Sequence, residues 1–575
     1  MSDAVQSEVG KDVTWGLDLI SESVLDREMP PVEQMGIDDV RSWLELYDRE
    51  LSAAEEEADL DTFYKTGGRD PVRPDLADEA RRRKTEIGKP GSHYARLIDR
   101  FSELASSPID LRAADLRSRR SLYDAVSSNA EFERLKDEAL TALRTKKIDG
   151  GPHGDIELGE AVKLLQTEQD ADVRRKIYMG KRNLEGIEEM LHTEITHLTE
   201  VARNVTAGTD TPFQNFFELN AHVAEVGTAE HISTVMRTFI EGTRGVYNQL
   251  VRELVTDETI NPWDYAFLYT QQDPFTKLPV PQDPWELFDL GLQILEDLGY
   301  ERAFLRDFYN PKKAGVYFDI EDRKGKTPGA GTFSLGPFST GKNMMYYAPV
   351  IFEGNPRRRY IVFPHELGHG IDHEFAREAV ENHGQGIFFT DAVPGRETIS
   401  TFHEHATLDK SALHKYLGLS EDDARHFAKW QLLHVISQLY SIAGVTLGEL
   451  GMHTKGVEYA RESAFEAESL IRPDIIATDL GPSSDYVSVH HLIEIPAYYF
   501  GYYFAHENQM ALTGAWESQV GSVFNQRTAP WLIDNIMIGN VKPMRERVAD
   551  ATGITDPAQY VAEYVQREHA RLQEQ

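Results

Sequence analysis

Two histidines lie four residues apart in the stretch "FPHELGHGID" (363–372), with Glu366 directly after the first of them. On a helix, positions i and i+4 share a face, so His365 and His369 can bind one metal ion through their imidazole rings. Glu366 can then reach a water molecule activated by that metal and accept its proton. The pattern also arises by chance, as a polar patch on a buried helix. The apolar "YIVF" that precedes it favours a buried active-site helix.

Two neighbours of the histidines affect how this helix is built. Pro364 lacks a backbone N–H, so we expect it to kink the helix or to begin it, and residues 365–369 form one helical turn in both cases. Gly368 lies directly before the second histidine, and we expect its missing side chain to leave room at the site.

A zinc ion held in this way needs a third protein ligand and keeps its fourth position for water. The chain has no cysteine, so the ligands must be His, Asp or Glu. A third histidine ten residues after the first is excluded, because that position holds Phe375. The acidic residues that follow the motif are the candidates, namely Glu374, Glu378, Glu381 and Glu397.

Glu397 stands out among these candidates because it begins "ETISTFHEHATL", a segment with helical periodicity and an apolar side. Glu404 follows two helical turns later on the same face. It can hydrogen-bond a ligating imidazole from behind, or it can be a solvated charge on the helix surface. For Glu381, in "VENHGQG", exposure in a loop is the better interpretation.

Composition limits the class of protein. The chain has 575 residues, 60 of them basic and 95 acidic, which gives a net charge of −35. So acidic a chain disfavours nucleic acid and anionic membranes as partners. The first residues, "MSDAVQSEVGKDVTWG", lack the pattern of a secretory signal, and no apolar run reaches the length of a membrane span. We therefore expect a cytoplasmic protein.

The elements that must position these residues are mostly helical. Helical periodicity begins near Asp38, we expect no strand before about residue 300, and "DPWELFDLGLQILEDLG" (283–299) predicts a helix capped by Asp283. Strands are predicted in "AGVYFDI", "GAGTFSLGPF" and "KNMMYYAPVIFEG". The predicted organisation is a loose N-terminal arm (1–35), an N-terminal helical lobe (36–210) and a catalytic lobe (211–575). The last contains a small sheet (about 313–353) and the zinc-binding helices (about 357–410).

"HELGH" followed by "ETISTFHE" resembles the oligoendopeptidase F and thimet oligopeptidase family of zinc metallopeptidases, as does, less specifically, the helix at 170–183. Members carry a Glu-Ile-Ala-Ser-Thr-Phe-Asn-Glu helix, which Glu397, Ser400, Thr401, Phe402 and Glu404 match in place. The resemblance implies that Glu397 is the third zinc ligand and that Glu404 supports a ligand from behind. The chain departs from the family at Asp372, where many members have a histidine, so no role is assigned to the adjacent His373.

Hydrolysis of a peptide bond passes through an oxyanion, which tyrosine can stabilise as a neutral donor. In "VHHLIEIPAYYFGYYFAHE" (489–507), "YFGY" resembles the family's Tyr-Tyr-Gly-Tyr cluster, which assigns donor roles to Tyr499 and Tyr502. The family's upstream histidine falls on His490, with His491 adjacent. Another family tyrosine falls near Ile495, where Tyr498 can substitute. We rank Tyr502 first, then His490 or His491, then Tyr499; for some of these aromatics, helix packing is the alternative.

The resemblance implies a mainly α, two-lobed helical metallopeptidase with a deep central channel and a small β-sheet next to the zinc-binding helices. It implies one zinc ion per chain and endopeptidase activity on short unfolded peptides, with Glu366 as general base. We expect the peptide to bind extended, beside "MMYYAPVIF" (344–352). The alternatives are a zinc carboxypeptidase on a similar scaffold and an inactive peptide-binding relative. The sequence leaves the oligomeric state and the cleavage preference open.

Overall fold

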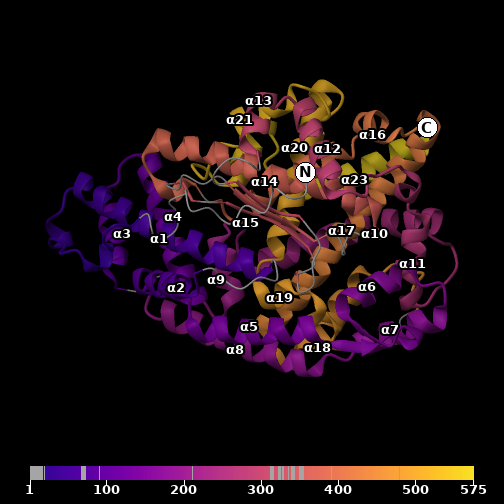
Figure 1. The fold of residues 1–575 in the computed structure, drawn as a ribbon, viewed down its shortest axis with the longest axis horizontal. Coiled ribbons are helices and arrows are strands. Elements are labelled where there is room, and N and C mark those ends of the chain that lie inside the picture. The colour runs from indigo at the N-terminus through magenta and orange to yellow at the C-terminus, as the bar shows by residue number, and fades with distance from the viewer. Residues whose placement is uncertain are drawn as a thin grey trace.

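The fold is given by a computed structural model of the chain. It describes residues 17, 20–66, 73–89, 91–209, 212–310, 316–320, 326, 329–334, 336–337, 343–348, 355–389, 391–477 and 480–574. Helices dominate this part of the chain, and Figure 1 shows a small sheet among them. This confirms the predicted mainly α architecture with a small sheet beside the motif helices.

The N-terminal part is a set of packed helices that begins with two short 3-10 turns. Within the predicted arm, Val24, Val32 and Met35 are buried with Val40 of the first helix, and residues 1–16 lie outside the described residues. The elements are η2 (Val24–Asp26), η3 (Val32–Gln34), α1 (Ile37–Thr66), α2 (Pro74–Gly88), α3 (His93–Leu104), α4 (Pro108–Ser127), α5 (Ala130–Thr145), α6 (Leu158–Thr167), α7 (Ala171–Lys181) and α8 (Glu185–Thr206).

A short hairpin interrupts these helices and corrects the expectation of no strand before about residue 300. Strands β1 (Lys147–Asp149) and β2 (Asp155–Glu157) pair antiparallel around the 3-10 turn η4 (Gly151–His153). Each strand buries a single isoleucine, Ile148 or Ile156, against α6 and α7. Three-residue strands are too short for periodicity to show in the sequence.

The middle of the chain is again helical. Its elements are α9 (Phe216–Val223), α10 (Ala229–Leu254), α11 (Pro262–Gln272), η5 (Pro274–Lys277), α12 (Pro284–Leu298) and α13 (Arg302–Phe308). The predicted cap of α12 is confirmed, because the Asp283 side chain accepts hydrogen bonds from the backbone N–H groups of Trp285 and Glu286.

The central sheet has three described strands, β3 (Val316–Asp319), β4 (Ala330–Ser334) and β5 (Asn343–Tyr347), in the order β3-β5-β4. β5 is parallel to β3 and antiparallel to β4, so both of its edges are paired. β4 packs against α14 (Pro356–His383). The expectation that a peptide adds beside "MMYYAPVIF" is therefore wrong for its described part, 344–348, while 349–352 lie outside the described residues.

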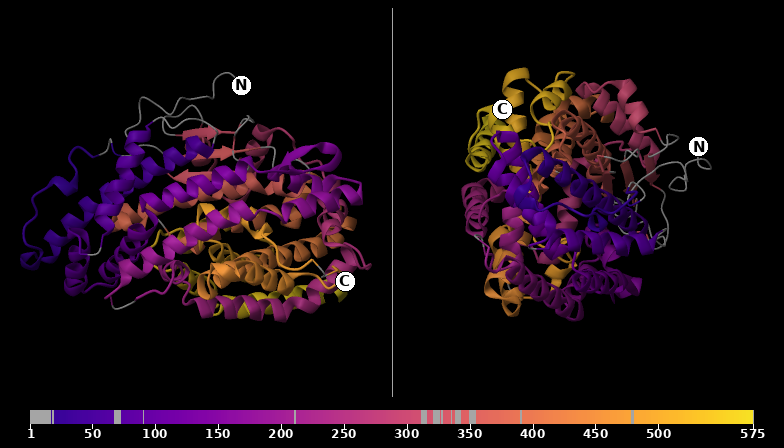
Figure 2. Two further views of the ribbon diagram at one scale, coloured as in Figure 1. Left: turned by 90° about the horizontal axis from the view of Figure 1, so that it is seen from below. Right: turned by 90° about the vertical axis from the view of Figure 1, so that its left-hand side faces the viewer.

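Helices again fill the rest of the chain. Figure 2 places the sheet and the C-terminal helix α23 on opposite sides of the molecule. The remaining elements are η7 (Gly386–Phe388), α15 (Val393–Thr407), α16 (Lys410–Leu417), α17 (Glu421–Lys455), η8 (Val457–Tyr459), α18 (Ala460–Ile471), η9 (Asp485–Ser488), α19 (His491–Glu494), α20 (Phe500–Val520), α21 (Thr528–Asn535), α22 (Met544–Thr552) and α23 (Pro557–Glu574).

Two large apolar clusters hold these parts together. One joins α12, α13, the sheet and α14 to α15 and α20–α22. The other joins Val126 and Phe132 of the N-terminal helices to Trp430 and Phe500 of the C-terminal ones. The division of the chain at residue 210 stays a prediction. Among the described residues, no helix combines the length and apolarity that crossing a membrane requires.

Candidate metal centre and active site

A cavity of about 1930 Å³ lies between the N-terminal helices and the C-terminal part of the chain. Its wall includes residues of α1, α4 and α5 on one side and of α14, α15 and α20 on the other. The motif residues His365, Glu366, His369 and Glu397 all line it. The cavity is the deep central channel that the fold prediction called for.

The histidine motif lies in the middle of α14, and Glu397 lies in the second turn of α15. α14 begins at Pro356, with Asn355 as its cap, and continues through Pro364. Pro364 therefore neither begins nor ends the helix. Long packed helices on both sides of the site fix the directions of the three side chains.

Three candidate ligand atoms converge. The Nε2 atoms of His365 and His369 lie 3.2 Å apart, and Glu397 Oε2 lies 3.6 Å from the first and 3.5 Å from the second. All three lie within 4.8 Å of one another, which makes these residues a group that can hold a metal ion. Two imidazoles and one carboxylate are a donor set that suits zinc and leaves a coordination position open.

Glu404 lies behind this group. Its Oε2 is 3.4 Å from His365 Nδ1, the nitrogen that faces away from Glu397. Burial opposes a charged His365, but the hydrogen bond with Glu404 and the nearby carboxylates outweigh it and raise the His365 pKa to about 9. A carboxylate on the distal nitrogen fixes the orientation of a ligating ring.

The candidate ligand Glu397 has support of its own. Tyr498 donates its hydroxyl to Glu397 Oε1 at 3.2 Å, and Ser400 donates to Oε2 at 3.3 Å. Glu397 is only 5% exposed. These contacts hold the carboxylate in place before any metal is present.

Glu366 is the candidate general base. It is 6% exposed, and its Oε2 accepts no hydrogen bond from the described residues. Burial, together with repulsion from Glu397, raises its pKa to about 7 although His365 opposes the shift. Thr332 of β4 donates its hydroxyl to the backbone carbonyl of Glu366 at 3.0 Å and so ties the edge strand to this turn of α14.

The space next to Gly368 is filled by α15 and is not part of the metal pocket. A Cβ atom at this position would lie 2.8 Å from His403 Nδ1 and 3.1 Å from the Cα of Ser400. The glycine therefore lets the two ligand-bearing helices approach closely. Gly501 does the same for α20 and α15, since a Cβ there would lie 2.0 Å from Val393 Cγ1.

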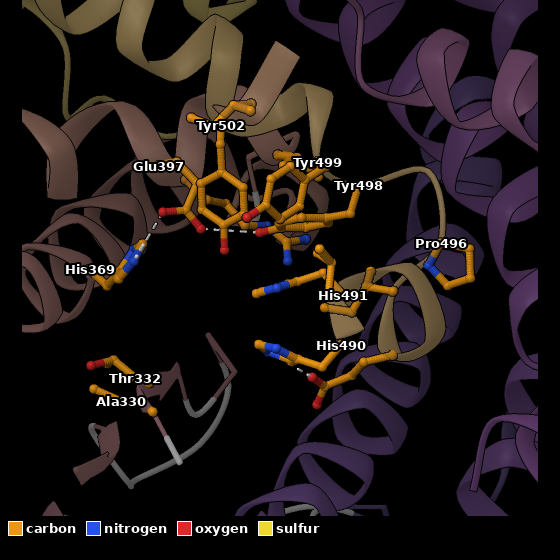
Figure 3. A pocket seen from close by; sticks show the side chains of 18 of the residues that line it. Ala330, Thr332, His369, Glu397, His490, His491, Pro496, Tyr498, Tyr499 and Tyr502 are labelled. Atoms are coloured by element: carbon orange, nitrogen blue, oxygen red, sulfur yellow. Dashed lines mark hydrogen bonds and ion pairs between the residues drawn. The ribbon is translucent and has the colours of Figure 1, made fainter. Parts of the chain in front are cut away.

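The aromatic segment lies across the cavity from the sheet. Figure 3 shows Tyr498, Tyr499 and Tyr502 reaching into the space beside Glu397, with Thr332 opposite them. The Tyr502 ring lies edge-on to those of Tyr498 (5.4 Å) and Tyr499 (5.6 Å). Burial raises the pKa of Tyr498 and of Tyr502 well above the usual value, so both hydroxyls are protonated donors at neutral pH.

The two candidate histidines differ in their contacts. The ring of His491 lies edge-on to Tyr499 at 5.5 Å and to Tyr502 at 5.8 Å. Burial, with the neighbouring charges of His490 and Arg358, lowers the pKa of His491 to about 3. The side chain of His490 is 47% exposed and lies 3.7 Å from Glu494. Both rings point into the cavity, and His491 is the one packed against the tyrosines (Figure 3).

Other residues considered from the sequence lie elsewhere. Glu374 pairs with Arg377, and Glu378 and Glu381 are exposed on α14, so the latter is helical and not in a loop. His373 stacks on Phe389, and Tyr503 packs in the core against Phe239 and Phe504.

The segment before Tyr498 depends on two residues that the sequence gave no reason to select. Ala497 has a φ of 56°, which is unusual for a residue other than glycine. Its N–H donates to Glu449 Oε1 at 2.5 Å, and its carbonyl accepts a hydrogen bond from Asn220 Nδ2 at 2.7 Å. Both side chains are buried. A local sequence motif could not reveal Glu449 and Asn220, because they lie 48 and 277 residues from Ala497 in the chain.

Fold and site together define a class: a mainly helical protein that encloses a channel, with a His-Glu-x-x-His helix and a downstream glutamate in its wall. No family model matches the sequence, and no curated protein does.

Solved structures share the fold. PZ peptidase A, solved with an inhibitor, has 15% identity and a TM-score of 0.64, covering 94% of this chain and 93% of its own. A protein described as an oligoendopeptidase F has 15% identity and a TM-score of 0.64, covering 96% and 94%. Another so described, from Bacillus anthracis, has 15% identity and a TM-score of 0.58, covering 93% and 91%. The chain thus has the fold of these oligopeptidases over nearly its full length, as the sequence resemblance predicted.

Proposed function

We propose that this chain is a zinc-dependent endopeptidase that hydrolyses short, unfolded oligopeptides. The observation that carries the proposal is the convergence of His365, His369 and Glu397 within 4.8 Å in the wall of a channel of about 1930 Å³. The fold shared with PZ peptidase A and the oligoendopeptidase F structures supports it. A channel with the site in its wall suits peptides that can enter it as a single extended chain.

The residues fit one zinc ion per chain. His365 and His369 would bind it through Nε2 and Glu397 through Oε2, while Glu404 orients His365. When bound, zinc polarises the scissile carbonyl and makes water a stronger acid. Side chains of the protein carry out the other steps of the reaction.

Glu366 accepts the proton of the attacking water and delivers it to the nitrogen of the leaving amine. Its buried position and its free Oε2 suit a group that must take up and release a proton. Tyr502 and His491 donate hydrogen bonds to the developing oxyanion, with Tyr499 and His490 next to them. Tyr498 keeps the Glu397 carboxylate in place.

The peptide binds extended along β4. Residues 330–333 of this strand line the cavity, and β4 is at the border of the sheet, since it pairs with β5 on one side and with no other described strand. An added strand would run past Glu366, to whose backbone Thr332 is hydrogen-bonded.

The decisive experiment compares Glu366→Gln with the wild type after both are loaded with zinc. Losing the general base should lower kcat by about 10²–10⁴-fold while the metal content stays at one zinc per chain. Chelation of the wild type should abolish hydrolysis, and added zinc should restore it. Undiminished turnover in the Glu366→Gln variant would refute the assignment.

Product analysis separates the proposal from the alternative of a zinc carboxypeptidase. Peptides blocked at both ends should be cut internally, and their fragments can be identified by mass spectrometry. Cleavage only next to a free C-terminus would favour the carboxypeptidase. A zinc-loaded wild type that binds peptides without cutting any would favour an inactive peptide-binding protein.

A further inference from the structure

Most of the lysines and arginines that line the central cavity are paired with a carboxylate. Twelve described lysines and arginines lie in its wall, and eight of them form an ion pair with a carboxylate. The eight are Lys65, Arg81, Lys84, Arg119, Arg120, Lys136, Arg357 and Arg472. Within the described part of the chain, the other four have no carboxylate in ion-pair distance; they are Arg144, Lys181, Arg358 and Arg396.

Two of these four have other partners. Arg396 donates to the backbone carbonyl of Asp391 at 2.8 Å, and the charge of half-buried Lys181 is balanced in part by Asp485 and Glu468. Arg144 and Arg358 differ, because both side chains are exposed in the cavity wall. Among the described residues, two guanidinium groups are thus left without a carboxylate in ion-pair distance, in a chain whose net charge is −35.

Both arginines line the cavity whose wall also contains His490, His491 and Tyr499. Burial lowers the pKa of His490, and the positive charges of both arginines lower it further. The charge of Arg358 also contributes to the low pKa of His491 and opposes the rise that burial causes in the pKa of Tyr499. Arg144 comes from α5 and Arg358 from α14, so two helices far apart in sequence each contribute a cation to the wall of this cavity. The carboxylate of Glu494, which also lines this cavity, lies 3.7 Å from His490 Nε2.

Helix stability does not explain Arg358. It occupies the first turn of α14, where the helix dipole disfavours a cation. Its neighbour Arg357 is 2% exposed and pairs with Asp273 at 3.1 Å, so that cation is compensated inside the protein. Arg358 donates its backbone N–H to Asn355, and no described residue forms an ion pair with its side chain. A cation that is kept at an unfavourable position, with no ion-pair partner among the described residues, indicates a role other than stabilising the fold.

We propose that Arg144 and Arg358 bind a carboxylate group of the peptide substrate in the stretch of channel beside His490 and Tyr499. Guanidinium groups form charge-assisted, often bidentate hydrogen bonds with carboxylates. The carboxylate is either the free C-terminus of the peptide or an Asp or Glu side chain. The subsite rests on the proposed function and adds to it a preference for peptides that place a carboxylate at this position.

The test uses one peptide sequence in matched versions. A C-terminal acid is compared with the amide, and Glu is compared with Gln at each position in turn. Binding is measured by fluorescence anisotropy on zinc-loaded Glu366→Gln protein, and kcat/KM is measured on the Glu366-containing enzyme. At least one carboxylate version should bind about tenfold or more tightly than its neutral partner, and added salt should reduce this ratio.

Arg144→Gln and Arg358→Gln, made in both backgrounds, should each reduce that ratio, and the double variant should bring it close to one. Arg237→Gln on α10, an exposed arginine outside the cavity wall, should keep the wild-type ratio. If the arginine variants lose the affinity ratio between the C-terminal acid and the amide, the subsite binds the C-terminus. If they lose the ratio between the Glu and Gln versions, it binds a side chain.

Equal binding of all versions by the parent protein, or a ratio that survives the double variant, would overturn the subsite. Both results can be obtained by anisotropy even if no peptide is cut. Failure of the proposed function has a different signature, which is zinc-loaded wild type that hydrolyses neither the neutral nor the acidic versions.

Discussion

The two halves of the candidate site are built in different ways. The metal-binding half lies on α14 and α15, two long helices whose functional residues are spaced by whole turns. The donor half lies around the four-residue helix α19 and the start of α20, on either side of Ala497 with its positive φ. The first half is held by helix geometry and a close helix–helix contact at Gly368. The second is held by hydrogen bonds from distant helices.

This difference shows which parts of a site a local pattern can specify. Helical spacing alone aims His365 and His369 at one point. The direction of Tyr498, in contrast, depends on Asn220 of α9 and Glu449 of α17, which bind the backbone of the residue before it. Substitutions in the two halves should therefore have different effects. Those in the first half should weaken metal binding, and those in the second should lower kcat while the metal is retained.

The largest expected effect in the donor half is that of Tyr502→Phe. Removing one hydrogen-bond donor to an oxyanion lowers kcat by about 10²–10³-fold. Zinc content should not change, because Tyr502 belongs to no part of the metal group. Tyr503→Phe is the matched control, since this ring packs in the core, and its kcat should stay within about twofold of the wild type. Loss of zinc in Tyr502→Phe would contradict the separation of the two halves.

In the metal half, Glu404→Ala should weaken zinc binding by about 10–100-fold, because His365 loses the carboxylate that orients its ring. Competition with a chelating dye measures the affinity, and activity should return at saturating zinc. Glu378→Ala on α14 is the control, since that side chain is exposed. Unchanged zinc affinity in the Glu404 variant would show that its contact with His365 plays no part in metal binding.

Gly368→Ala tests the contact between the ligand-bearing helices. The added Cβ meets Ser400 and His403 at 3.1 Å or less, so the free energy of unfolding should fall by about 1–3 kcal/mol. Gly245→Ala in α10 meets no atom within 4 Å and should instead stabilise the protein by about 0.5–1 kcal/mol. Urea denaturation of the two variants measures both changes in the free energy of unfolding. A Gly368→Ala protein as stable as the wild type would contradict the proposed role of this glycine.

The smallest expected effect is that of Asn220→Ala. One buried hydrogen bond to the Ala497 carbonyl is lost, worth about 0.5–1.5 kcal/mol, so kcat should fall by less than about tenfold with zinc retained. Adding Ala497→Gly should recover part of the loss, because glycine adopts the positive φ without strain. A fall in zinc content, or a double variant worse than the single one, would argue against a role in placing the tyrosines.

The sequence predicted the fold class and much of the candidate site. The histidine spacing, the block around Glu397 and the cap of α12 could be read directly, since each depends on residues within a few turns of one another. The β1–β2 hairpin could not be read from the sequence, and neither could the identity of β4 as the strand at the border of the sheet. Three-residue strands leave no periodicity, and the strand order β3-β5-β4 departs from chain order.

The amino-acid sequence by itself determined that this chain is acidic, free of cysteine and mainly helical, with a metal-binding pattern on one helix and a glutamate on the next. Only the tertiary structure decided that the three candidate ligand atoms meet, that Tyr498 reaches Glu397, and that β4 borders the channel. It also decided that two arginines in the channel wall have no ion-pair partner among the described residues. The physical reason is range: helical spacing acts over a few residues, whereas these contacts join helices and strands that the chain separates by dozens to hundreds of residues.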